Sequence, residues 1–71
     1  MKLTVIIEHD HDVFVSHCPE LHITSQGDTK EEALAHLKAA VELFLEHADR
    51  QEVANRLASG VTISQIEVPY V

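Results

Sequence analysis

Cysteine occurs once in the 71 residues, at Cys18, so the chain cannot close an internal disulfide. A disulfide-stapled secreted domain is thereby excluded, and a lone thiol is typical of a reducing compartment. The two glycines, Gly27 and Gly60, stand too far apart to build a loop that cradles phosphates. No apolar run approaches the ~20 residues needed to cross a bilayer, and no signal peptide is present. We therefore expect a cytoplasmic protein with no membrane association and no cofactor.

Basic residues are also scarce, since five Lys and Arg face twelve Asp and Glu and give a formal net charge of −7. Such a chain repels the phosphates of nucleic acids and attracts basic surfaces. We predict no direct binding to nucleic acid and expect a basic protein as the partner.

Length bounds the fold, because a chain of 71 residues forms one domain, here residues 1–71, with a thin hydrophobic core. A core in a chain this short seldom supplies more than about 3–5 kcal/mol, and no disulfide framework reinforces it. We therefore predict a homo-oligomer, a dimer or higher.

The first third of the chain alternates between apolar and polar residues, as strands do. Lys2–Glu8 and Val13–His17 are two such runs, and the polar turn His9–Asp12 between them predicts an antiparallel hairpin. A third strand is expected over Leu21–Ser25, after Pro19 has removed one backbone donor from the ladder.

A helix follows, because Thr29 and Glu32 form a capping box just before Lys30. At helical spacing one continuous apolar stripe results, suited to packing on a sheet. Its members are Ala33, Leu34, Leu37, Ala40, Val41, Phe44, Leu45 and Ala48.

A second cap signature, Asp49 with Glu52, indicates a short helix that ends before Gly60. One bent helix over residues 30–59 is the alternative. Val61–Val68 is predicted as a closing strand, with a change of phase near Ser64 that implies a bulge. The expected fold is α+β, in the order β-β-β-α-(short α)-β, with an antiparallel sheet and the main helix packed on one face.

Three apolar residues have no place in a single layer of sheet and helix. Ile6 and Phe14 are expected on the sheet face away from the helix, and Leu43 lies opposite the centre of the helical stripe. An apolar face is more easily covered by a second subunit than by water. We predict Ile6, Phe14 and Leu43 as the oligomer interface.

Two groups of side chains have the chemistry of metal ligands or nucleophiles. The turn His9–Asp12 combines imidazoles with carboxylates, and His17, Cys18 and His22 form a looser group. Neither has a four-ligand set at a recognisable spacing, and His17 and Cys18 point to opposite faces of a strand. We predict no metal site, no catalytic residue and no enzyme activity; a small metal-binding or thiol protein remains the least favoured alternative.

Carboxylates in the loops around the hairpin are the better candidates for an acidic contact surface. The alternative is that they form an ordinary solvated rim. The predicted partner-binding residues are Glu8, Asp10, Asp12, Glu20 and Leu21.

Three motifs stand in fixed order: Cys18-Pro19-Glu20-Leu21, then Ser25-Gln26-Gly27-Asp28-Thr29, then Glu31-Glu32-Ala33-Leu34. This run resembles the HicB antitoxin family over roughly residues 1–48. The resemblance implies a partial ribonuclease-H-like fold of three strands, a helix and a further strand. It departs at His22–Thr24, where family members commonly show Pro-Gly.

By the same resemblance the chain would bind HicA, a small basic toxin that cleaves messenger RNA with a catalytic histidine, and would cover its active site. Many HicB antitoxins also carry a C-terminal DNA-binding domain, for which this chain has no room, so operator binding is not expected. The alternative is an oligomeric scaffold or regulatory module with no toxin partner.

Overall fold

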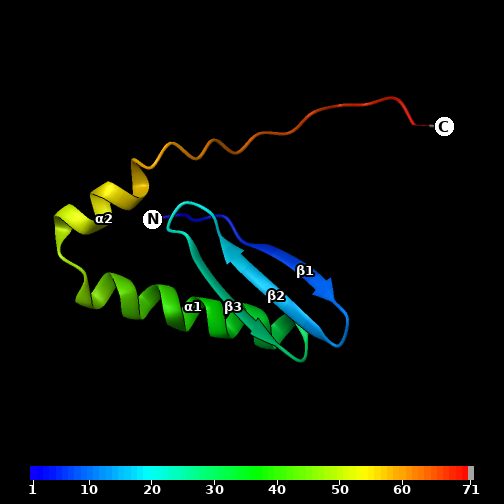
Figure 1. The fold of residues 1–71 in the computed structure, drawn as a ribbon, viewed down its shortest axis with the longest axis horizontal. Helices are drawn as coiled ribbons and strands as arrows, with labels where there is room; N and C mark the ends of the chain where they lie inside the picture. Colours follow the sequence, from blue (N-terminus) through cyan, green and yellow to red (C-terminus); the bar gives the residue numbers. More distant parts are fainter. Residues whose placement is uncertain (71) are drawn as a thin grey trace.

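The computed structural model describes residues 1–70 and shows an α+β fold of three antiparallel strands followed by two helices (Figure 1). The sheet has the order β1-β2-β3. The elements are β1 (Ile6–Asp10), β2 (Val13–Cys18), β3 (Ile23–Gly27), α1 (Lys30–His47) and α2 (Arg50–Leu57). The predicted order of strands and helices up to residue 57 is confirmed.

A tight connection sets the register of the β1–β2 hairpin. Asp10 pairs with Val13, so only two residues form the turn, and His11 adopts a left-handed conformation with φ 55°. This register places Ile6 opposite His17. Because directly paired residues share a face, even-numbered residues of β1 lie beside odd-numbered residues of β2.

The expectation that Ile6 and Phe14 share a face is therefore wrong. Ile6 lies with Val13 and Val15 on the open face of the sheet, whereas Phe14 lies on the face toward α1, as Ser16 does. The physical reason is the even length of the turn. Both a four-residue turn over His9–Asp12 and the observed two-residue turn pair even-numbered residues of β1 with odd-numbered residues of β2, so only a turn of odd length would have placed Ile6 and Phe14 on one face.

The loop between β2 and β3 is a compact turn and not the start of a strand. The N–H of Leu21 donates to the carbonyl of Cys18 at 3.3 Å, and that of His22 donates to Pro19 at 3.4 Å. His22 has a φ of 56°, so the chain reverses there and β3 begins only at Ile23.

Helix α1 starts at the predicted cap and packs closely on the sheet. The Thr29 hydroxyl accepts from the N–H of Glu32 at 3.0 Å, and the Ser16 hydroxyl donates to the carbonyl of Ala33 at 2.8 Å. A Cβ on Gly27 would lie 2.6 Å from the nitrogen of Ala33, so this position requires glycine. α1 lies mainly on β3, less on β2 and least on β1.

The chain forms two helices, which decides between the two alternatives for residues 30–59. Ala48 is extended, with ψ 145°, and ends α1. The side chain of Asp49 then accepts from the N–H of Glu52 at 2.8 Å and starts α2. Arg56 holds α2 on the body of the molecule, because its guanidinium donates to the carbonyl of Leu21 at 2.7 Å and lies 4.5 Å from the centre of the Phe44 ring.

The predicted closing strand over Val61–Val68 is wrong for the isolated chain, since residues 61–70 pair with no strand in the described part of the structure. Figure 1 shows this segment, the C-terminal arm, as an extended trace running from α2 away from the sheet. Its apolar residues change phase between Ile63 and Ile66. A strand with apolar residues on both faces cannot bury them against one face of its own body.

Candidate functional site

Two turns meet at one end of the molecule and gather exposed carboxylates there. The β1–β2 turn lies beside the β3–α1 turn, because Val13 pairs with Asp10 while the next residue, Phe14, pairs with Gly27 (Figure 1). We call this surface the acidic end. Its exposed carboxylates are Glu8, Asp10, Asp12, Asp28, Glu31 and Glu32.

Sequence reasoning found half of the acidic end. Glu8, Asp10 and Asp12, three of the predicted contact residues, are exposed there. Asp28, Glu31 and Glu32 were missed because, in the sequence, they belong to a helix cap. The pairing of Phe14 with Gly27 brings the cap beside the hairpin, and only the strand register could have revealed it.

Glu20 lies at the opposite end and has a structural role. Its carboxylate accepts the backbone N–H of Thr4 at 2.9 and 3.1 Å and the Thr4 hydroxyl at 2.7 Å. The hydroxyl bond is the main reason that the pKa of Glu20 lies below its usual value. This carboxylate ties the segment before β1 to the loop after β2.

Leu21 is a correction to the predicted contact surface. Its side chain is fully buried in the core with Cys18 and Leu37. The turn that follows Cys18 directs it inward, so it is not available to a partner.

The group of His17, Cys18 and His22 is dispersed in the structure. His17 hydrogen-bonds Thr24 at 2.9 Å, and His22 hydrogen-bonds Ser59 at 2.8 Å. Burial is the main cause that raises the pKa of the Cys18 thiol, and the charge of Glu20 raises it further. A raised pKa keeps the thiol protonated, which is the opposite of what a nucleophile requires.

The histidines of the hairpin also lack the surroundings of a metal centre. The ring of His9 stacks on Phe14 with centroids 4.2 Å apart and planes 7° from parallel. Across residues 1–70, no three His, Cys, Asp or Glu side chains come together in a way that could hold a metal ion.

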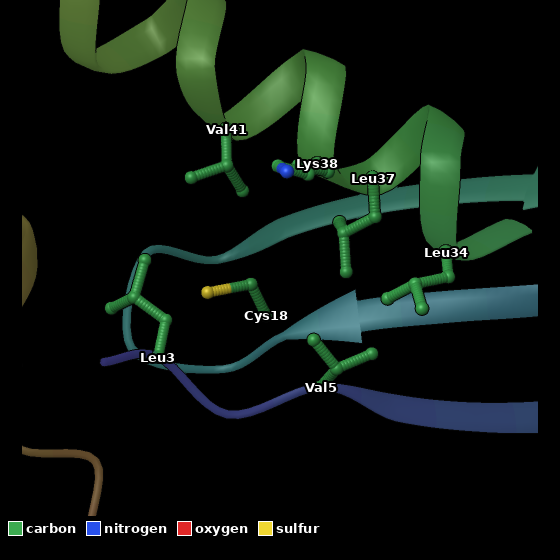
Figure 2. A pocket seen from close by; sticks show the side chains of 7 residues that line it. All are labelled: Leu3, Val5, Cys18, Leu34, Leu37, Lys38 and Val41. Atoms are coloured by element: carbon green, nitrogen blue, oxygen red, sulfur yellow. The ribbon is translucent and has the colours of Figure 1, made fainter. Parts of the chain in front are cut away.

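A second surface feature is an apolar groove of about 260 Å³ between α1 and the start of β1. Figure 2 shows Leu34, Leu37 and Val41 pointing from α1 toward the other lining residues. Those are Leu3 and Val5 from the segment before β1, Cys18 at the end of β2, and Lys38, which contributes its aliphatic stem. No predicted site residue lines this groove.

The predicted oligomer contacts lie apart from one another. Leu43 is 58% exposed on α1, and Ile6 is exposed on the open face of the sheet. Phe14 is half-buried on the other face under His9. The three residues therefore do not form one continuous patch.

Comparison with known proteins gives one relative over the full length. The chain is 32% identical over 71 residues to a UPF0150 protein of Helicobacter pylori strain J99, and the alignment covers 99% of both chains. No family model and no solved structure matches the chain significantly. Among residues 1–70, no helix is long and apolar enough to span a membrane.

Proposed function

The chain belongs to the UPF0150 family, and we propose that it acts as an acidic, non-enzymatic binding protein of the HicB antitoxin type. Its partner would be a small basic toxin of the HicA type, whose active site and RNA-binding surface it covers in the cytoplasm. The observation that carries this proposal is the acidic end, where two turns expose six carboxylates.

Electrostatics supports this pairing. A surface that binds RNA is basic because it must neutralise phosphates, and carboxylates attract the same surface. The net charge of −7 raises the association rate with such a protein, while the acidic end determines where it docks. Both turns are short and are anchored by strand pairing or by the Thr29 cap, so little chain entropy is lost on binding.

The same residues argue against catalysis. The carboxylates of the acidic end are exposed, and among residues 1–70 no three His, Cys, Asp or Glu side chains come together to hold a metal ion, whereas metal-assisted cleavage of a phosphodiester needs carboxylates gathered around ions. The Cys18 thiol is buried, and its hydrogen-bond partner is the carboxylate of Glu20 at 3.7 Å, which cannot activate it. These features favour binding over turnover.

Co-expression with a basic protein encoded beside this chain tests the proposal. We expect growth rescue and co-purification with the natural sequence. The double variant Asp10→Lys/Asp12→Lys should weaken binding by roughly tenfold or more, because it reverses charge inside the contact.

The matched control is Glu42→Lys/Glu46→Lys, which makes the same change in net charge on the exposed side of α1. It should retain most of the affinity. Equal losses in both double variants would show that net charge alone acts, and failure to bind any basic neighbour would refute the proposal.

A second candidate is an oligomeric scaffold or regulatory module without a toxin. The apolar groove and the exposed C-terminal arm favour this candidate, since both concern apolar association and neither concerns the acidic end. A stable oligomer that ignores every basic neighbour would support it.

A further inference from the structure

The apolar groove marks a part of the sheet that its own helix leaves uncovered. α1 packs over β3 and β2, and β1 receives the least cover. Leu34 belongs to the apolar stripe of α1, yet it is 45% exposed, whereas Leu37 one turn later is buried. The stripe therefore extends beyond the surface that the chain itself provides.

The C-terminal arm is the complementary feature, because it carries apolar side chains that are largely exposed. Ile66 is 84% exposed and Val68 is 68% exposed. The two side chains are two residues apart and would point to one face if the arm were a strand. Ten extended residues reach about 33 Å, which exceeds the length of β1.

The root of the arm is fixed where the chain leaves α2. The Ser59 hydroxyl meets the ring of His22 at 2.8 Å, and Arg56 binds the carbonyl of Leu21. Gly60 then adopts φ 89°, a left-handed conformation that glycine takes without strain, and the arm begins after it.

The dimensions of the isolated chain also indicate a missing contact. Its radius of gyration is 14.1 Å, against about 11 Å for a compact domain of this length. Its accessible surface is 5801 Å², against roughly 4,400 Å² for a compact monomer of this mass. The excess exceeds the ~800 Å² that one partner buries in a standard interface.

We infer that the arm of one copy docks along β1 of a second copy and places Ile66 and Val68 in its apolar groove. β1 is an edge strand, so it offers unpaired backbone groups as well as the groove beside them. Exchange of identical segments between two copies satisfies both grooves without distorting either fold. The inference rests on the groove and the arm, and it is independent of toxin binding.

A small molecule is a poorer occupant of this groove. Its volume of about 260 Å³ is below the ~300–1,000 Å³ of typical ligand pockets. Its walls are apolar and offer no group that would orient a ligand.

Sedimentation of the full chain at tens of micromolar tests the inference. We expect a dimer or larger assembly for the natural sequence. Leu34→Asp in the groove and Ile66→Asp/Val68→Asp in the arm should each raise the dissociation constant by at least about tenfold for every apolar side chain lost. Leu43→Asp is the matched control, since it places the same charge on an exposed leucine of α1 outside the groove.

Mixing the groove variant with the arm variant distinguishes an arm that docks on a second copy from an arm that docks on its own sheet. One has an intact arm and the other an intact groove, so an equimolar mixture should recover dimer at a concentration where neither variant forms it alone. The arm variant keeps the test valid if Leu34→Asp proves unfolded by circular dichroism, because Ile66 and Val68 are largely exposed and their substitution removes little packing within the chain.

Three outcomes would overturn the inference. The first is a monomer whose arm amides are protected from hydrogen exchange, which would place the arm on its own sheet. The second is dissociation by Leu43→Asp with no effect of the arm variant. The third is a mixture that remains monomeric while both variants are folded.

Discussion

Single residues of the Cys18–Leu21 loop hold the fold together where the motif suggested a contact surface. Glu20 reaches across to Thr4, Leu21 fills the core, and Cys18 packs beside it. The order of residue types in this loop was visible in the sequence. Their direction was not, because the reversal at His22 decides which side chains turn inward.

At this scale we predict that Glu20→Gln lowers the free energy of unfolding by about 1 kcal/mol at pH 7, since the bonds to Thr4 lose their charge assistance. Urea unfolding monitored by circular dichroism measures the difference.

The same variant should change the pH dependence of stability. The folded pKa of Glu20 is lowered, so the unfolded state binds this proton first and stability rises with pH. The contribution is present above about pH 4.3, the usual pKa of Glu, and is lost as the pH falls through the lower folded value. Natural and variant proteins should therefore converge in acid, and a constant gap between pH 7 and pH 3 would contradict this role.

Among the elements, those with local signals were predictable and those that depend on pairing were not. The caps at Thr29 and Asp49 and the apolar stripe of α1 placed both helices. The relative faces of β1 and β2 depend on whether the turn between them has an even or an odd number of residues, which the polar character of His9–Asp12 does not fix. Three residues of the acidic end, Asp28, Glu31 and Glu32, could not be predicted from the sequence, because the pairing of β2 with β3 brings them beside the hairpin.

The guanidinium of Arg56 links helix α2 to the body of the molecule. The helix has no buried residue, and Arg56 links it to Leu21 and Phe44. We predict that Arg56→Met speeds hydrogen exchange in α2 by about tenfold, since one charge-assisted hydrogen bond contributes about 1.5–3 kcal/mol before discount for partial exposure.

Arg50→Met is the control, because Arg50 is exposed at the first position of the same helix. Exchange in α1 should stay unchanged in both variants. Equal acceleration by the two substitutions would show that α2 responds to loss of charge and not to loss of the Leu21 contact.

For the whole molecule, the two surfaces should respond oppositely to salt. Raising the ionic strength shortens the range of electrostatic attraction from about 10 Å at 0.1 M to about 3 Å at 1 M. We predict that association with a basic toxin slows at least about tenfold over this range, whereas self-association through the apolar groove is unchanged or strengthened. Stopped-flow and sedimentation measurements on one preparation would check both, and a shared salt response would mean that one surface serves both contacts.

The β1–β2 and β3–α1 turns lie at the end of the hairpin away from Leu3, Val5 and Cys18, so an arm docked in the apolar groove would leave the two turns open on each copy. Such a particle is bivalent. When one acidic end has bound a cationic protein, the other acidic end is held close to a second cationic protein linked to the first, at an effective concentration of about millimolar. The overall affinity for such linked targets would then exceed the affinity of either contact alone.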